Sequence, residues 1–171
     1  IVALAGGCPL LKSVGGYFTL DGATRMFTGE SMLTDAIVAR VVLRPEAAEL
    51  TEVNLAYCSL LTDVSIVALF GNCPLLKSVG GYFTLGGAMF TGEPRLTDAI
   101  VARVVLRPEA AELTEVNLEG CELLTDASIG ALAGSCPLLE SVNLAYCELL
   151  TDVSIVAFAG SCPLLESVNL R

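Results

Sequence analysis

Residues 124–149 read LTDASIGALAGSCPLLESVNLAYCEL, and two hydrophobic periodicities follow one another in this stretch. In its first half, Ile129 and Leu132 recur at helical spacing. Thr125 and Asp126 come before them, and their side-chain oxygens are suited to capping the N-terminus of a helix. The first half of the stretch therefore predicts a helix behind Thr125 and Asp126.

The second half changes from helical spacing to the alternation of a strand. Gly134 and Pro137 predict the end of the helix, because Gly tolerates a positive φ and Pro lacks an N–H. Leu139, Val142 and Leu144 then follow the spacing L-x-x-L-x-L, in which the last two alternate as one face of a strand. One helix and one strand per stretch, stacked on copies of themselves, predict a curved parallel sheet.

The stretch is one copy of a repeat that runs through the chain. Residues 1–65 align with residues 66–128 almost letter for letter, apart from a two-residue deletion opposite Thr24 and Arg25. A shorter unit lies within this long one, and the tripeptide Leu-Thr-Asp marks it at intervals of 28, 35, 28 and 26 residues. Intervals in this range suit one solenoid coil each. The tripeptide begins at Leu33, Leu61, Leu96, Leu124 and Leu150.

The motif in the last two coils resembles a known repeat family. Cys136-Pro-Leu-Leu-Glu-Ser-Val-Asn-Leu-Ala-Tyr-Cys147, followed by Glu-Leu-Leu-Thr-Asp, is similar to the cysteine-containing leucine-rich repeat of F-box substrate receptors. The resemblance covers essentially the whole chain. It is weaker in the coils from Leu33 and Leu96, where Leu-Arg-Pro-Glu replaces the first Cys-Pro.

The repeat and the resemblance together predict an α/β fold, a leucine-rich-repeat solenoid or horseshoe formed by residues 1–171 as one domain. We expect about six parallel strands on its concave face, helices on its convex face, and two inserted β-hairpins. Coils are expected to begin near 33, 61, 96, 124 and 150, behind a partial first coil at 1–32. Because a lone coil cannot offset the entropy of ordering it, we expect a fragment of a longer array. Its open edge strands favour end-to-end self-association.

Charge and hydropathy argue against two classes of partner. The net charge is −10, from 19 acidic and 9 basic residues, and the basic residues are scattered singly. Binding phosphates requires clustered Lys and Arg, so we expect no nucleic-acid partner. Hydrophobic residues make up 54% of the chain. No apolar run reaches the roughly 18 residues of a membrane span, however, so we expect no membrane partner.

The chain has seven cysteines, an odd number, and they recur with the repeat instead of in close pairs. Metal sites favour pairs such as C-x-x-C, so we expect no metal and no cofactor. We expect the thiols to pack in two columns, with disulfides between neighbouring coils and a reactive thiol as alternatives. Buried free thiols favour a reducing cytoplasm. One column holds Cys58, Cys121 and Cys147, and the other Cys8, Cys73, Cys136 and Cys162.

Polar residues between the buried strand residues predict a binding face on the concave side. An Asn occupies the same slot in four coils, and a Glu stands two residues before it in two of them. Concave strands commonly bind partners in such solenoids, but Asn also merely solvates a sheet face, and both interpretations stay open. The candidates are Asn54, Asn117, Asn143, Asn169, Glu52 and Glu115.

Two longer inserts, at residues 17–28 and 82–91, predict β-hairpins. In the second, Gly86-Gly87 provides the positive φ that a two-residue turn requires. The aromatic residues of these inserts are either interface anchors on a projecting loop or a plug beside Gly16 and Gly81, which occupy the slot of a buried leucine. We favour the plug. The candidates are Tyr17, Phe18, Phe27, Tyr82, Phe83 and Phe90.

The sequence carries no catalytic signature. It has no His, no G-x-S-x-G, no Walker loop and no Gly-rich dinucleotide fingerprint, and capping explains the Asp of each Leu-Thr-Asp. We therefore expect no enzyme but a scaffold that binds another protein. The F-box resemblance implies substrate recognition in a ubiquitin-ligase receptor. The alternatives are a structural or self-associating array, natural or engineered, and, least favoured, a hydrolytic enzyme with acid pairs on the concave face.

Overall fold

A computed structural model describes residues 13–14, 18–21 and 25–171. The chain falls into two compact units, Ile1–Gly81 and Tyr82–Arg171, which we call unit 1 and unit 2 and describe separately. The single solenoid over residues 1–171 stays a prediction.

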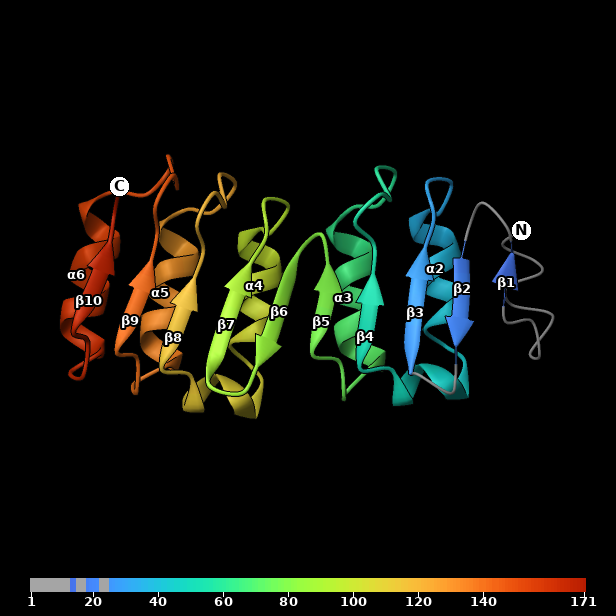
Figure 1. Ribbon diagram of the computed structural model, residues 1–171, viewed down its shortest axis with the longest axis horizontal. Helices are drawn as coiled ribbons and strands as arrows, with labels where there is room; N and C mark the ends of the chain where they lie inside the picture. The colour runs from blue at the N-terminus through green and yellow to red at the C-terminus, as the bar shows by residue number, and fades with distance from the viewer. Residues whose placement is uncertain (1–12, 15–17, 22–24) are drawn as a thin grey trace. The chain divides into compact units, whose positions relative to one another are not determined.

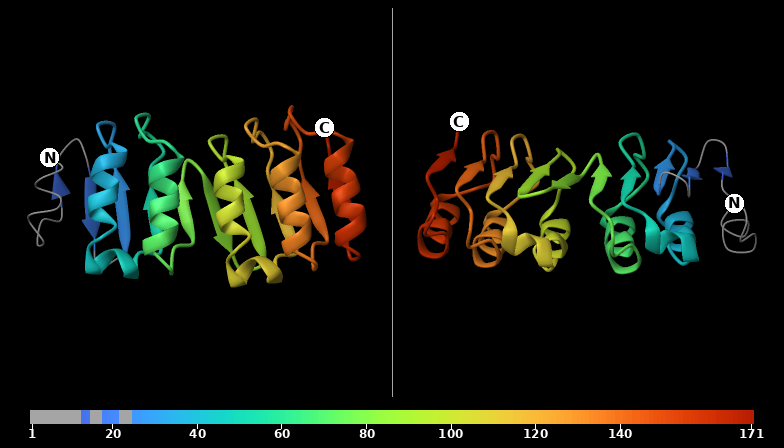
Figure 2. Two further views of the ribbon diagram at one scale, coloured as in Figure 1. Left: turned by 180° about the vertical axis from the view of Figure 1, so that it is seen from behind. Right: turned by 60° about the horizontal axis from the view of Figure 1, so that its bottom comes forward.

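Unit 1 is a layer of strands with its helices on one face (Figures 1 and 2). The sheet has the order β1-β2-β3-β4-β5, in which β2 is antiparallel to β1 and β3, whereas β3, β4 and β5 are parallel. Helix α2 connects β3 to β4, and α3 connects β4 to β5. The elements are β1 (Ser13–Val14), β2 (Phe18–Asp21), β3 (Met26–Gly29), α2 (Asp35–Val41), the 3-10 helix η1 (Pro45–Glu49), β4 (Glu52–Asn54), α3 (Asp63–Asn72) and β5 (Ser78–Gly80).

Unit 2 repeats this plan. Strand β6 is antiparallel to β7, and β7, β8, β9 and β10 are parallel neighbours in that order. A helix connects each parallel strand to the next, and these helices lie on one face of the sheet (Figure 2). The elements are β6 (Phe83–Gly86), β7 (Met89–Gly92), α4 (Asp98–Val104), the 3-10 helix η2 (Pro108–Glu112), β8 (Glu115–Asn117), α5 (Asp126–Ser135), β9 (Ser141–Asn143), α6 (Asp152–Ser161) and β10 (Ser167–Asn169).

The helices begin where the Leu-Thr-Asp motif predicts them. Before α5, the Thr125 hydroxyl oxygen accepts a hydrogen bond from a first-turn amide at 3.3 Å. The prediction that Gly134 stops this helix is wrong, because Gly134 lies inside the last turn and the helix continues to Ser135. Cys136 is the C-cap and Pro137 follows it. The helix therefore ends where Pro, which has no backbone N–H to donate, cannot continue it. Among the described residues, no helix is long and apolar enough to cross a membrane.

The strands align equivalent residues of neighbouring coils. Val116 pairs with Val142, and Val142 pairs with Val168. Val116 and Val142 are buried between outward-facing neighbours. The predicted side-by-side pairing of the Val-Asn-Leu segments is therefore confirmed in unit 2.

Both predicted hairpins are present, with a shifted turn in the second. Gly86 pairs with Met89, so the two turn residues are Gly87 and Ala88 instead of Gly86 and Gly87. Gly87 has a φ of 60°, which suits the first position of a type II′ turn. In unit 1, β2 and β3 form the corresponding antiparallel pair, and residues 22–24 lie outside the described residues.

The second arm of each hairpin is also a strand of the parallel array. Phe90 of β7 pairs with Val116, and Phe27 of β3 pairs with Val53, so each Phe stands in the slot of a coil valine. Gly92 then falls in the slot of a coil leucine. A Cβ at Gly92 would meet the Leu96 side chain at 2.6 Å, so no side chain fits there without displacement. Only the first arm of each hairpin is therefore an insertion between coils, because the second arm is itself a strand of the parallel array.

Candidate binding face

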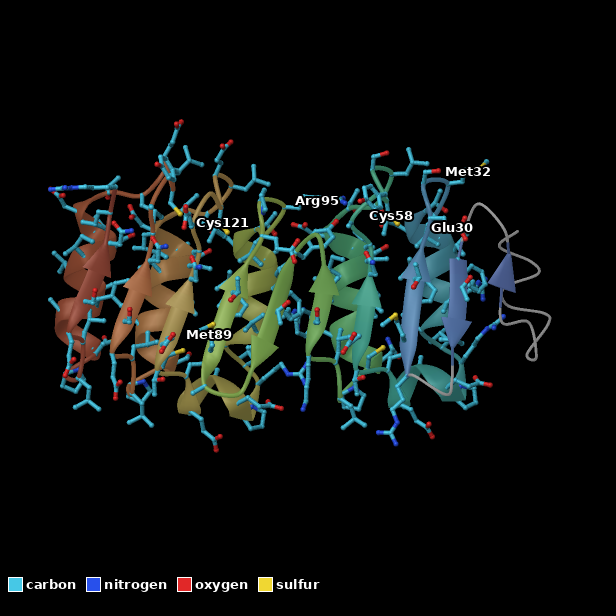
Figure 3. The ribbon with its side chains drawn as sticks, viewed as in Figure 1. Glu30, Met32, Cys58, Met89, Arg95 and Cys121 are labelled. Atoms are coloured by element: carbon cyan, nitrogen blue, oxygen red, sulfur yellow. The ribbon has the colours of Figure 1, made fainter. Side chains whose placement is uncertain are left out.

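The open face of the unit 2 sheet, opposite the helices, carries two rows of side chains in register. In β8 and β9 the first and third residues of each strand face outward, because successive side chains alternate across a strand. Figure 3 shows Met89 on β7, where the first row begins. The first row holds Met89, Glu115, Ser141 and Ser167, and the second holds Thr91, Asn117, Asn143 and Asn169.

Each Asn of the second row is held by its own backbone. The Asn117 Oδ1 accepts a hydrogen bond from the Glu119 N–H at 3.1 Å, and Asn143 Oδ1 accepts one from the Ala145 N–H at 3.1 Å. Asn169 makes the equivalent bond, at 3.2 Å. These residues therefore close the turn after the strand through their side-chain oxygens, which leaves their amide NH₂ groups as the donors of the face. The repeated Asn therefore has a structural role in closing the turn. This role differs from the two that were considered from the sequence, which were solvation of the sheet face and partner binding.

Two carboxylates give this face its charge. The Glu115 side chain is exposed and, within the described residues, makes no hydrogen bond or ion pair. Glu119 follows β8, and its carboxylate accepts a hydrogen bond from Asn143 Nδ2 at 3.1 Å. The face thus places acceptors beside amide donors, an arrangement that suits Lys or Arg of a protein partner.

Unit 1 has a shorter version of the same face. Glu52 lies between Met26 and Ser78 in one row, and both Glu52 and Asn54 are exposed. Asn54 Oδ1 accepts a hydrogen bond from the Ala56 N–H at 3.1 Å. The row of Asn does not continue, because Gly80 stands opposite Asn54 in β5.

The aromatic candidates of the hairpins are buried. The interpretation in which they project as interface anchors is therefore wrong for the described residues, because their side chains are buried. Phe83 and Phe90 fall on the core side of their alternating arms. The Phe83 and Phe90 rings pack with centroids 6.1 Å apart, and the Arg95 guanidinium lies 4.6 Å above the Tyr82 ring. Tyr17 lies outside the described residues. The buried candidates are Phe18, Phe27, Tyr82, Phe83 and Phe90.

Two exposed tyrosines lie outside the hairpins, in the turns that follow strands β4 and β9. Tyr57 is 84% exposed in unit 1, and Tyr146 is 67% exposed in unit 2. Tyr146 lies three residues after the end of β9 and has a φ of 60°, so it stands in the turn that continues this strand. The sequence signal was the repeated Ala-Tyr-Cys, which sequence reasoning passed over in favour of the hairpin aromatics.

The first cysteine column links each coil to the one before it. The Cys58 thiol donates to the Glu30 carbonyl at 3.3 Å, and Figure 3 shows Cys58 beside the turn that carries Glu30 and Met32. Cys121 and Cys147 make the same kind of bond, to the Glu93 and Leu118 carbonyls at 3.4 and 3.1 Å. The expectation that these thiols are buried is confirmed for Cys58, Cys121 and Cys147.

Burial also sets the chemistry of the thiols. It raises the pKa of Cys73 and Cys136 to about 11 and that of Cys121 to about 12, so these thiols are protonated at neutral pH. The six described cysteines are free. Within the described residues, no three His, Cys, Asp or Glu side chains gather as a group that could hold a metal ion.

The aspartates of Leu-Thr-Asp cap the helix of the following coil. The N–H and hydroxyl of Thr62 donate to Asp35 at 3.0 and 2.7 Å, and the Ser65 hydroxyl also donates to it. Asp98 receives the same bonds from Thr125 and Ser128. We call this recurring set the aspartate bridge. The expectation of an aspartate that caps its own helix is therefore replaced, for these residues, by a contact between coils.

A third aspartate bridge joins the last two coils, and it has the clearest effect on ionisation. The N–H and hydroxyl of Thr151 donate to Asp126 at 2.9 and 2.6 Å, and Ser154 donates as well. The hydrogen bonds from Ser154 and Thr151 lower the pKa of Asp126 to about 2. At Asp35 and Asp98 burial alone would raise the pKa, but the hydrogen bonds outweigh it and lower the pKa.

Comparison with known proteins relates this arrangement of strands and helices to a repeat family. A family described as Leucine Rich repeat matches residues 135–159, and no curated protein matches the sequence. A chain in the crystal structure of the Rad7 and Elc1 complex in yeast is similar with a TM-score of 0.55 at 20% identity, over 84% of this chain and 34% of that chain. The leucine-rich repeat-containing protein LegL7 from Legionella pneumophila is 13% identical with a TM-score of 0.36, over 84% of this chain and 54% of its own.

The matched residues 135–159 contain β9 and most of α6, which together form one turn of the repeat. The chain is built from leucine-rich repeats. It spans about a third of the yeast chain and about half of LegL7. The family match and the likeness to the yeast chain support the leucine-rich-repeat fold. In this leucine-rich-repeat fold, the open face is the face formed by the strands, and the aspartate bridges lie at the N-termini of the helices.

Proposed function

We propose that this leucine-rich-repeat chain is a protein-interaction scaffold whose unit 2 contacts a partner through the open sheet face. We define the binding face as Glu115, Asn117, Glu119, Asn143 and Tyr146. The observation that carries the proposal is the unpaired, exposed carboxylate of Glu115 beside a row of Asn amides held in fixed positions. Side chains held in place lose little entropy on binding, which favours their use in recognition.

The composition of the face predicts the chemistry of the partner. Glu115 and Glu119 are acceptors for Lys or Arg, the Asn amides are donors, and Tyr146 supplies an exposed aromatic ring. Tyr is enriched at protein interfaces, where its apolar ring and polar hydroxyl both find contacts. The net charge of −10 also favours a basic partner, because it steers the encounter. We therefore expect a protein with a basic, hydrogen-bonding surface.

A binding role is favoured over catalysis by the positions of the acids. Asp35, Asp98 and Asp126 are engaged in aspartate bridges. A general acid or base needs a pKa near the working pH, whereas these carboxyls have lowered pKa values. This supports the proposal that the chain is not an enzyme.

A finer proposal is substrate recognition in a ubiquitin-ligase receptor. The similarity of the repeats to those of F-box substrate receptors supports it, as does a structural neighbour from the Rad7 and Elc1 complex. If it is correct, a partner captured by the binding face carries less ubiquitin when the protein is depleted. Wild-type protein should restore the modification and Glu115→Lys should not.

A charge reversal with a matched control tests the binding face. Glu115→Lys changes a side chain that makes no hydrogen bond or ion pair within the described residues, and Glu112→Lys makes the same change on η2, at an exposed residue that is not part of the binding face. We expect partners cross-linked to wild type and to Glu112→Lys to be lost from Glu115→Lys, with equal circular dichroism for all three. Equal capture by both variants would reject the open face as the interface.

A further inference from the structure

We infer that the turns after β8 and β9 form a second contact surface, which takes an amphipathic helix of another protein that carries Lys or Arg beside its apolar stripe. We call it the edge surface and define it as Glu122, Leu123, Tyr146, Glu148 and Leu149. It shares only Tyr146 with the binding face. The inference goes beyond the proposed function, because it does not require the open sheet face to bind.

Each of the two turns carries an exposed leucine. Leu123 is 52% exposed and Leu149 is 54% exposed, whereas Leu124, the residue after Leu123, is buried. In unit 1, Leu60 occupies the same slot of its coil and is 57% exposed. The exposure is therefore a property of each coil and does not come from the end of the chain.

Packing within a coil does not require an apolar residue in this slot. One coil before Leu123 the slot holds Arg95, whose guanidinium lies 4.6 Å above the Tyr82 ring. Figure 3 shows Arg95 and Cys121 at the same edge of unit 2. The leucine that fills the core is the next one along, Leu124. Exposed leucines that the fold does not need, gathered at one place, are typical of an interaction site.

Hydrogen bonds between the two coils hold their turns side by side. The Gly120 N–H donates to the Ala145 carbonyl at 2.9 Å, beyond the last paired residues of β8 and β9. The third aspartate bridge joins the same two coils where their helices begin. The register of the strands therefore continues through the turns, so Leu123 and Leu149 follow the spacing of neighbouring strands, about 4.8 Å.

This spacing favours a helix over an extended peptide as the partner. A helix rises about 1.5 Å per residue, so side chains three or four residues apart on one face are separated by about 4.5–6 Å along its axis. An extended chain places side chains of one face about 6.6–6.8 Å apart. A helix that crosses the coils thus brings successive apolar residues against Leu123 and Leu149.

Open space beside Tyr146 can receive a side chain of the helix. Gly120 occupies the slot of Tyr146 one coil earlier, and both residues have a positive φ, 71° and 60°. A Cβ at Gly120 would meet nothing within 4 Å. The edge surface therefore pairs an exposed ring with a gap, which suits a projecting apolar side chain.

Carboxylates beside the leucines determine the charge of the partner. Glu122 precedes Leu123 and Glu148 precedes Leu149, and both acids are exposed. Within the described residues, neither side chain makes a hydrogen bond or ion pair. Lys or Arg on the flank of the helix would pair with them. The same carboxylates repel nucleic acid, anionic lipid and, at a net charge of −10, a second copy of this chain.

An unbiased peptide selection tests the inference. A display library of random peptides about 20 residues long, which allows several turns of helix or an extended chain, is selected on the wild-type protein. Fluorescence anisotropy then measures the enriched peptides on wild type, on the double variant Leu123→Ser/Leu149→Ser and on Leu138→Ser. Leu138 is the control, because it is also exposed but precedes β9 instead of following a strand. Circular dichroism shows that each variant is folded.

We expect the enriched peptides to carry apolar residues three and four apart, with Lys or Arg beside them. The double variant should weaken their binding by about tenfold or more, and Leu138→Ser and Glu115→Lys should retain it. Binding that is equal on the double variant and wild type, or enrichment of acidic or alternating extended sequences, would overturn the edge surface. Peptides lost from Glu115→Lys but kept by the double variant would support the binding face and likewise overturn the edge surface.

Discussion

The Asp126 carboxylate accepts hydrogen bonds from both the N–H and the hydroxyl of Thr151, a residue 25 positions later that opens the next helix. The contact joins two coils at the point where a helix leaves its first amides unsatisfied. It also relates stability to pH, because only the ionised carboxylate accepts all of these bonds.

Stability should therefore depend on the ionisation of Asp126. Its pKa is lowered to about 2 in the fold, below its ordinary value, so its contribution is present above about pH 4 and is lost as the pH falls toward 2. We expect Asp126→Asn to lower the free energy of unfolding at pH 7, and the difference from wild type to shrink toward pH 2. Urea denaturation across this range measures it. A difference that stays constant with pH would contradict the assignment.

The serine of the bridge should contribute measurably on its own. The buried Ser128 hydroxyl donates to Asp98, and Ser128→Ala removes the donor without changing the helix. We expect a loss of about 1.5–3 kcal/mol in the free energy of unfolding, which is typical of a hydrogen bond to a charged group. Ser135→Ala, in the same helix, is the control and should change it by less than about 0.5 kcal/mol. Similar losses in both variants would contradict a specific contribution of the hydrogen bond from Ser128 to Asp98.

Gly92 should be intolerant of any side chain. An added Cβ would lie 2.6 Å from a Leu96 methyl and 2.8 Å from the Cys121 sulfur. We expect Gly92→Ala to cost about 1–3 kcal/mol, as overpacking does. Gly130→Ala faces open space in α5 and should instead stabilise by about 0.5–1 kcal/mol, since Gly is a poor helix former. Thermal unfolding of the two variants compares them, and a tolerated Gly92→Ala would mean that the leucine slot is not filled as described.

The thiols should be unreactive until the coils open. Burial raises the pKa of Cys121 to about 12 and that of Cys73 and Cys136 to about 11. Because the folded pKa values lie above those of the unfolded chain, the thiols also favour the fold less as the pH rises beyond about 9. In a Cys8→Ser variant, thiol labelling at pH 8 should be slow in buffer and fast in urea. Fast labelling in buffer would show that the cysteine columns are open.

The periodic parts of the fold could be predicted from the sequence because each coil encodes its own alternation. The helical spacing of Ile129 and Leu132 predicts the helix, and the alternation of Val142 and Leu144 predicts the strand. Neither prediction requires knowledge of the neighbouring coils. The turn of the second hairpin was displaced by one residue, because Gly86 and Gly87 both tolerate a positive φ and the pairing of Gly86 with Met89 decides between them.

The contacts between coils could not be predicted in this way. An Asp in the first turn of a helix is equally compatible with capping that helix and with reaching the next one, and only the stacking distance distinguishes the two. The same limit applies to the hairpin aromatics. Alternation places Phe83 and Phe90 on one side of each arm, but it does not say that this side is the core.

The pairing of neighbouring coils is tested most directly by NMR couplings transmitted through hydrogen bonds. The structure predicts a coupling between the Leu118 amide nitrogen and the Asn143 carbonyl carbon, and another between Leu144 and Asn169, whose N–H groups donate at 2.8 Å. Both couplings should be observed, with slow exchange of the two amides. Coupling of either amide to a different carbonyl, or rapid exchange without coupling, would contradict the stacked repeat.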